Sequence, residues 1–182
     1  SIACPVCKKE HTHRYFRQKI FLAEERESDQ HVTKYKWLND RMARVHPPYY
    51  FLFFCPHCFF TDVPEDFTKP FNSEYGESVI RIFKRITPEQ RAVIEGFVGK
   101  INYEEIDFQS AVCMHALAAY IQIINEGELC DVYKAARILL RLGWLFREKK
   151  GDTDATETRG SARQDEDRCA TFANAMAAYS LK

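Results

Sequence analysis

Two Cys-Pro-x-Cys tetrapeptides constrain the fold of this chain more than any other feature of its sequence. They read CPVC at residues 4–7 and CPHC at residues 55–58. In each, proline fixes one backbone φ angle and stiffens a tight turn that can direct both sulfur atoms toward one ion. Because each tetrapeptide supplies half of a tetrahedral ligand set, we predict one metal site that joins two distant segments of the chain. Its ligands are Cys4, Cys7, Cys55 and Cys58.

Zinc in a structural role is the cofactor that this ligand set predicts. Zn²⁺ favours four thiolates in a tetrahedron, and four thiolates leave no coordination position for water or substrate. A thiol redox pair needs only one CxxC, so the presence of two favours zinc, with an iron–sulfur cluster as the alternative. We expect His11, His13 and His57, which lie near the tetrapeptides in the sequence, to remain outside the ligand set.

The chain contains seven cysteines, and three of them stand alone in segments that read as helical. An odd number of cysteines with three single ones is not typical of a secreted disulfide scaffold. We therefore interpret the single cysteines as small buried apolar side chains and not as reactive thiols. They are Cys113, Cys130 and Cys169.

The composition favours a globular cytoplasmic protein. Hydrophobic residues make up 46% and charged residues 29% of the 182 residues, which is enough to bury a core and remain in solution. The sequence lacks a run of about 18 or more apolar residues, so we expect no membrane-spanning helix and no membrane partner. The first ten residues lack the apolar segment of a signal peptide, which favours a cytoplasmic location.

The hydrophobic pattern predicts an α+β protein with two domains. Residues 1–75 are expected to form a small zinc-ribbon-like β head, in which the segment between the tetrapeptides is a long insertion. Within this insertion, residues 47–54 (PPYYFLFF) are typical of a buried strand, and residues 34–45 are expected to form a short helix or an irregular loop. Residues 76–182 are predicted to be helical, with a polar, mobile and dispensable loop at 151–168.

Helix start and stop signals are strong in the second half of the chain. Residues 87–90 (TPEQ) combine an N-cap threonine, proline at the first helical position and a capping-box glutamine. Two further helices are predicted over about 109–126 and 131–149, closed by Gly127 and Gly151. We expect these two helices to pack antiparallel.

The second of these helices has the spacing of a tetratricopeptide repeat. The first helix of such a repeat follows W-x2-L-G-x2-Y. The pattern predicts an α-helical tetratricopeptide-like bundle, and an ordinary helical bundle is the alternative. The matching positions are Leu139, Leu142, Gly143 and Phe146.

Basic and aromatic residues are interleaved in the predicted head. The net charge of the chain is zero, yet residues 1–60 carry ten basic and six acidic residues. Lys34, Lys36 and Trp37 would suit contact with phosphate groups and stacking on a base. An ordinary solvated surface is the alternative interpretation of the same residues.

Three segments, taken in order, resemble a known bacterial family. They read CPVCKKEHTHRYFR, HPPYYFLFFCPHCFFTD and ARILLRLGWLFREKKGD, and they extend from Cys4 to about Asp152. The combination is similar to the family catalogued as domain of unknown function 2225. Its members look like a Cys-Pro-x-Cys zinc-type head followed by tetratricopeptide-like helices. Glycine often follows each knuckle in that family, whereas Lys8 and Phe59 stand at these positions here.

These features favour a non-enzymatic, zinc-stabilised binding or scaffold protein that docks a protein or peptide partner on its helical domain. Glycine-rich phosphate loops and the GxSxG and HExxH motifs are missing from the sequence. The helix at 131–149 has apolar residues on more than one side, so we predict partner docking or self-association through the face that bears Trp144. One alternative is nucleic-acid or nucleotide binding by the head. The other is a zinc-dependent or thiol redox enzyme, which would need an open metal position or a reactive cysteine pair.

Overall fold

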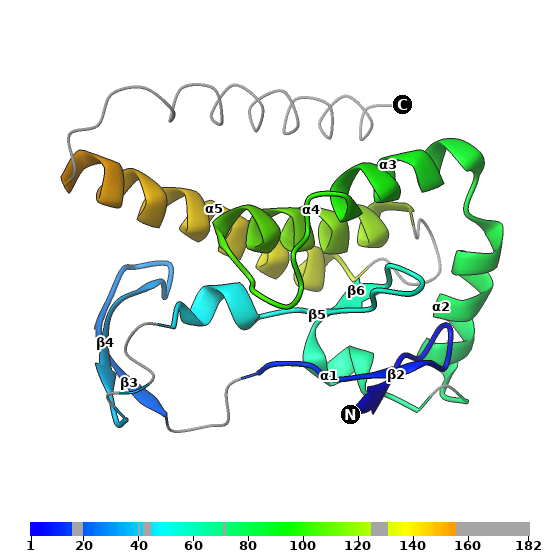
Figure 1. Ribbon diagram of the computed structural model, residues 1–182, viewed down its shortest axis with the longest axis horizontal. Coiled ribbons are helices and arrows are strands. Elements are labelled where there is room, and N and C mark those ends of the chain that lie inside the picture. The colour runs from blue at the N-terminus through cyan, green and yellow to red at the C-terminus, as the bar shows by residue number, and fades with distance from the viewer. Residues whose placement is uncertain (16–19, 40, 42–44, 71, 125–130, 156–182) are drawn as a thin grey trace. The chain divides into compact units, whose positions relative to one another are not determined.

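The computed structural model describes residues 1–15, 20–39, 41, 45–70, 72–124 and 131–155, with the backbone alone described for 150–155 (Figure 1). The chain divides into two compact units, Ser1–Leu145 and Phe146–Lys182. The sheets, the core and the candidate site all belong to the first unit. The predicted head, residues 1–75, and the helices that directly follow it therefore lie in one unit.

The described strands form three separate two-stranded antiparallel sheets. The first and the third sheet each enclose one Cys-Pro-x-Cys tetrapeptide, because Ala3 pairs with Glu10 and Phe54 pairs with Thr61. The second sheet is a longer hairpin in the segment between the tetrapeptides. The strands are β1 (Ile2–Ala3), β2 (Glu10–His11), β3 (Phe21–Arg26), β4 (Val32–Trp37), β5 (Phe53–Phe54) and β6 (Thr61–Asp62).

The insertion differs from its prediction in two places. Residues 32–37 form strand β4 and neither a helix nor an irregular loop, because they pair with β3 across a hairpin. The predicted strand at 47–54 begins instead as a 3-10 helix, η2 (Pro47–Tyr50), and only Phe53–Phe54 are extended. Two consecutive prolines have no backbone N–H groups for a sheet and are tolerated at the first turn of a helix.

The helices α1 to α5 follow β6 in the chain and confirm the α+β class. The predicted capping box is present at the start of α3, where Thr87 Oγ1 accepts from Gln90 N at 3.2 Å and Gln90 Oε1 accepts from Thr87 N at 3.0 Å. The helices are α1 (Pro64–Phe67), α2 (Glu74–Arg85), α3 (Pro88–Val98), α4 (Phe108–Ile124) and α5 (Val132–Ala155).

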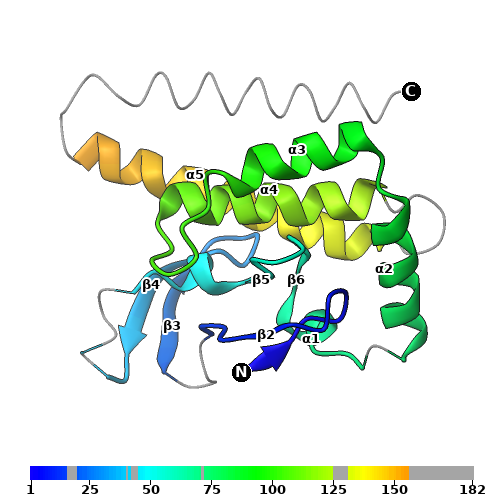
Figure 2. The same cartoon turned by 45° about the vertical axis from the view of Figure 1, so that its right-hand side comes forward.

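Helix α4 is the centre of the core. Every side chain from Ser110 to Gln122 is buried, so the helix is covered on all sides. It packs against α3, β6 and η2, and these contacts join the helices to the sheet that carries the second tetrapeptide. In both views α4 and the first part of α5 run in opposite directions, as the sequence predicted (Figures 1 and 2).

A buried polar network fixes the start of α5 to β6 and α1. The Lys134 ammonium donates to Asp62 Oδ2 at 3.1 Å, to Asp66 Oδ2 at 2.7 Å and to the Tyr75 hydroxyl at 3.0 Å. Tyr75 in turn donates to Asp62. Burial raises the pKa of Asp62, while the neighbouring Lys134 acts in the opposite direction. Lys134 and Asp62 are 4% and 0% exposed. Their mutual attraction and hydrogen bonds offset the desolvation cost of burying two charged groups.

The predicted helix ends fit the structure in part. Helix α5 continues through Gly151 to Ala155, so this glycine does not end it. The first five residues of the predicted loop at 151–168 are therefore helical, and 156–168 lie outside the described residues, as does Gly127. None of the described helices has the length and apolar character needed to cross a membrane.

Candidate metal centre

The two tetrapeptides adopt the same backbone conformation. In the first, Cys4 N donates to Lys9 O at 2.9 Å and Lys8 N donates to Cys4 O at 3.0 Å. In the second, Cys55 N donates to Phe60 O and Phe59 N donates to Cys55 O, both at 2.8 Å. Each tetrapeptide is thus a knuckle closed by the same pair of hydrogen bonds between two short strands. The repeated sequence produces a repeated structure.

The residue after each knuckle adopts a left-handed backbone. Lys8 has a φ of 66° and Phe59 a φ of 70°, and Gln30 is the other described non-glycine residue with a positive φ. Glycine enters this region at no steric cost, whereas a side chain there costs about 1–2 kcal/mol. This explains why glycine suits these positions in the family that the sequence resembles. Although Lys8 and Phe59 stand where glycine is common in that family, the two knuckles have the same backbone geometry.

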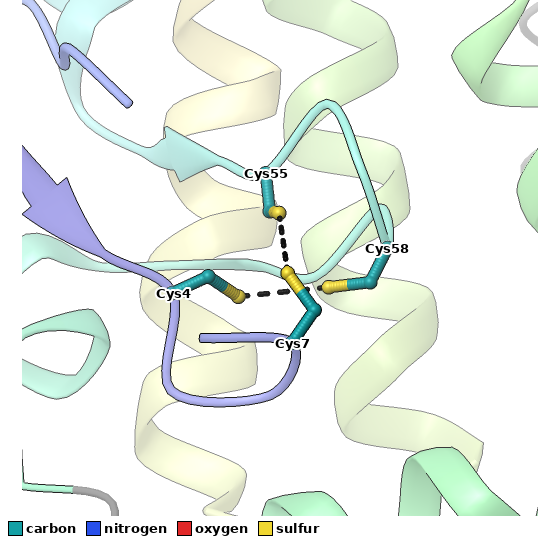
Figure 3. A group of neighbouring side chains, drawn as sticks. All are labelled: Cys4, Cys7, Cys55 and Cys58. Carbon is teal, nitrogen blue, oxygen red and sulfur yellow. Dashed lines mark hydrogen bonds between the residues drawn. The ribbon is translucent and has the colours of Figure 1, made fainter. Parts of the chain in front are cut away.

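All four predicted cysteine ligands converge (Figure 3). Their sulfur atoms lie within 4.8 Å of one another, and they are the one group of three or more metal-binding side chains found among the described residues. Across the two knuckles, Cys4 Sγ lies 3.5 Å from Cys58 Sγ and Cys7 Sγ lies 3.6 Å from Cys55 Sγ. A tetrahedron with Zn–S bonds of about 2.3 Å has sulfur–sulfur edges of about 3.8 Å. The cluster is therefore compatible with a metal ion.

Burial makes four adjacent thiolates costly unless a cation compensates them. Cys4 and Cys55 are buried, and Cys7 and Cys58 are partly exposed. Hydrogen bonding with Cys55, together with burial, raises the pKa of Cys4 to about 12. Hydrogen bonds from Cys4 and Cys58 lower the pKa of Cys55, whereas the pKa of Cys58 is raised. One sulfur thus becomes a thiolate readily, and a bound cation must displace the protons of its neighbours.

Three histidines lie beside the second knuckle but do not join the ligand cluster. His11 stacks on His57 with ring centroids 5.7 Å apart, and His13 packs against His11 at 4.6 Å. His13 Nδ1 forms a hydrogen bond of 2.6 Å with the Tyr103 hydroxyl, and its ring stacks on Phe53. Burial lowers the pKa of His13 to about 4, so it is neutral at pH 7. Their role in this arrangement is aromatic packing around the knuckles.

The predicted basic and aromatic residues of the head lie on the β3–β4 hairpin. Lys34 forms ion pairs with Glu24 and Glu25, both at 3.4 Å, and hydrogen bonds to these carboxylates raise its pKa. Lys36 is exposed. Trp37 contacts the Phe21 ring edge-on with centroids 5.6 Å apart. The positive charge of this patch is thus partly neutralised within the hairpin.

Trp144 of α5 contacts the turn between β3 and β4. Its indole Nε1 donates to Asp29 Oδ2 at 2.9 Å, and its ring stacks on His31 with centroids 5.1 Å apart. Residues 1–75 therefore cover part of the face that bears Trp144. The expectation that this face also meets a partner stays a prediction.

Arg141, which was not among the residues predicted from the sequence, is half-buried near Trp144. Its guanidinium lies 5.0 Å from the Trp144 ring and 3.9 Å from the Phe51 ring. A signal was present in the sequence, because Arg137 and Arg141 stand four residues apart on one predicted helix face.

The comparison with family models covers nearly the whole chain. Residues 1–180 match the family described as an uncharacterized protein conserved in bacteria, DUF2225. The chain belongs to this family. The match confirms the resemblance and extends it past Asp152, where the quoted segments end. No curated protein and no solved structure matches the chain. The family description states no activity.

Proposed function

We propose that this DUF2225 member is a non-enzymatic, zinc-stabilised binding protein that docks a protein or peptide partner on helix α5. The observation that carries the proposal is the exposure of large apolar side chains on that helix. Val132 and Tyr133 are 70% and 86% exposed, and Leu139 and Leu140 are 47% and 43% exposed. Within the described part of the chain these side chains remain exposed, so a partner gains apolar burial by covering them.

These residues lie on one face of α5. At about 100° per residue, Val132, Leu139 and Leu140 fall within one sector of the helix, together with Ala136 and Gly143. Among the described residues, no atom lies within 4 Å of the position that a Cβ atom would occupy on Gly143. A neighbouring helix can therefore approach closely at this point. An amphipathic helix of a partner suits such a face.

The proposal includes a tetratricopeptide-like pairing of α4 and α5. It is supported by the spacing of the repeat-like residues along α5 and by the opposite directions of the two helices (Figure 2). In such repeats, stacked helix pairs present a binding surface to peptides. Trp144 borders the proposed docking face, because it lies four residues after Leu140.

Zinc is the metal we propose for the cysteine cluster. Four sulfur ligands that lie within 4.8 Å of one another favour zinc over metals that prefer oxygen ligands or planar coordination. Four thiolates complete the coordination sphere, so this ligand set supports a structural role and leaves no position for a reacting water. A site with four thiolate ligands therefore does not favour a zinc hydrolase, which needs an open coordination position for water. Nucleic-acid binding by the hairpin gains no support, since Lys34 is paired with two glutamates.

The docking proposal is tested with matched variants in a pull-down from bacterial extract. Leu139→Glu places a charge within the face, and Val93→Glu is the control because Val93 is also exposed, at 36%, on α3. We expect Leu139→Glu to lose partners that the wild type and Val93→Glu retain, by at least about tenfold in recovered amount. Light scattering of the same proteins identifies self-association as the alternative occupant. Equal recovery and equal mass for all three proteins would refute docking on this face.

A further inference from the structure

Two arginines of α5 converge on one aromatic ring. The guanidinium carbon of Arg141 lies 3.9 Å from the centroid of Phe51, and that of Arg137 lies 6.0 Å from the same centroid. The Arg141 guanidinium also lies 5.0 Å from the Trp144 ring, which Asp29 holds in place through the indole N–H. Cation–π contacts with two rings restrict the Arg141 side chain, and so the position of its donors is largely set before any ligand arrives.

Neither arginine forms an ion pair or a hydrogen bond within the part of the chain that the structure describes. Lys134, which precedes them on the same helix, shows the contrast, because Asp62 and Asp66 both compensate it. Two carboxylates thus pair with the buried Lys134, whereas the half-buried Arg141 has no direct ion pair among the described residues. A half-buried charge without a counter-ion is costly. Burial, with repulsion from Arg137, lowers the pKa of Arg141, while electrostatic interactions with Glu65 and Tyr35 act in the opposite direction.

We propose that Arg137 and Arg141 bind the phosphate group of a phosphorylated ligand. A guanidinium offers a planar fork of N–H donors that matches phosphate oxygens. Two adjacent cations suit a phosphate group, with a charge of about −1.5 to −2 at pH 7, better than a single carboxylate. The anion reduces the repulsion between the two arginines and accepts hydrogen bonds from guanidinium groups that have no such partner among the described residues.

Arg137 stands four residues after Tyr133 and borders the exposed apolar residues of α5, whereas Arg141 is turned away from them. Phosphate binding by the two arginines does not depend on partner docking. Arg141 is turned about 100° around the helix from Leu140. Two kinds of ligand carry the phosphate group that the arginines would bind: free phosphate and a phosphorylated organic molecule. Inorganic phosphate and O-phosphoserine are therefore used as separate probes.

Calorimetric titration of the zinc-loaded chain tests the proposal. We expect the wild type to bind at least one of the two probes and to bind acetate at least tenfold more weakly. Arg141→Gln should weaken phosphate binding by at least tenfold, and Arg137→Gln should also weaken it. Arg91→Gln is the matched control, because Arg91 is an exposed arginine on α3, and it should bind as the wild type does. Tighter binding of O-phosphoserine than of inorganic phosphate assigns the source to a phosphorylated molecule, and the reverse order assigns it to free phosphate.

Folding of the variants is controlled by thermal unfolding without ligand. Because Arg141→Gln removes an uncompensated charge, it should melt no lower than the wild type. If it does melt lower, Arg141→Lys keeps the charge and loses the planar fork, and it should still weaken binding. The proposal is wrong if neither probe binds the wild type, if the arginine variants bind as tightly as Arg91→Gln, or if acetate binds equally well.

Discussion

Lys8 and Phe59 occupy equivalent positions after the two knuckles, yet their side chains have different contacts. Lys8 is exposed, and its ammonium donates to the Pro5 carbonyl, whereas Phe59 stacks on Phe54 with centroids 6.4 Å apart. Both residues have the left-handed backbone that glycine adopts without strain. The backbone strain is thus shared, but only at Lys8 can a substitution relieve it without removing an aromatic contact.

Lys8→Gly is therefore expected to be more stable than Lys8→Ala. Both variants lose the lysine side chain and its hydrogen bond, so their difference isolates the backbone conformation. We expect glycine to be favoured by about 1 kcal/mol in the free energy of unfolding, measured by urea denaturation of the zinc-loaded protein. Phe59→Gly should instead be destabilising, because it also removes the contact with Phe54. Equal stability of Lys8→Gly and Lys8→Ala would mean that the left-handed backbone carries no strain.

At the scale of single residues, local patterns were the ones that the sequence predicted well. Each CxxC motif and the capping box of Thr87 and Gln90 are patterns of residues a few positions apart, and because the first motif recurs, the sequence also predicted that the two distant cysteine pairs converge, as they do in the structure. The pairing of Lys134 with Asp62 links residues 72 positions apart. In the sequence each looks like an ordinary surface charge, because nothing local marks it for burial.

At the scale of elements, the long helices were predicted closely and the insertion was not. Helix α4 at Phe108–Ile124 lies close to the expected 109–126 because its apolar pattern is long. The strand β4 was missed because its six residues alternate weakly and include two lysines. Residues 47–54 are rich in aromatic side chains, a composition that fits a strand and a turn equally well. The two prolines favour the turn, because they suit the start of the 3-10 helix η2 and cannot donate hydrogen bonds in a sheet.

The complete burial of α4 predicts an acid sensitivity centred on His115. Its Nδ1–H donates to the Ala111 carbonyl at 2.7 Å, and burial lowers its pKa to about 4. Because the unfolded state binds the proton near pH 6.5, the contribution of neutral His115 is present above that pH and is lost as the pH falls toward 4. Between pH 7 and pH 5 the loss is about 2 kcal/mol.

The measurement is the change in unfolding free energy between pH 7 and pH 5 for the wild type and for His115→Gln. Glutamine keeps an N–H donor for Ala111 and does not titrate. The variant should therefore lose about 2 kcal/mol less than the wild type over this range. Any acid effect on the cysteine cluster is common to both proteins and cancels in the comparison. Equal losses would show that His115 is protonated as easily in the folded chain as in the unfolded one.

At the scale of the whole molecule, the sequence pattern and the packing of the chain change at different places. The sequence changes character near residue 75, from aromatic strands to amphipathic helices, and this change suggested two domains. In the structure α4 packs against β6, and residues 1–145 form one compact unit. Which residues form one unit depends on packing between segments that are distant in the sequence. Local hydrophobic periodicity gives no information about such packing.

One unit with a shared core should lose its helices when it loses its metal. We expect Cys55→Ser to weaken metal binding and to unfold α2, α3 and α4 together with the knuckles, because β5 and β6 connect the cysteine cluster to α4. Structural zinc contributes about 10–16 kcal/mol of apparent binding free energy, which is as large as the usual free energy of unfolding of a small domain, about 5–15 kcal/mol. Cys130→Ser, which changes a cysteine outside the two Cys-Pro-x-Cys tetrapeptides, is the matched control and should retain both metal and helix.

The experiment follows two signals during urea unfolding of the cobalt-substituted protein. Cobalt–thiolate absorption reports the knuckles, and far-ultraviolet circular dichroism reports the helices. In a cooperative unit the two transitions coincide, and chelation of the metal moves both midpoints together. If the cobalt signal disappears first while the helical signal persists, then residues 1–75 unfold independently. In that case the metal stabilises the head alone, and the packing of α4 against β6 is too weak to couple the two.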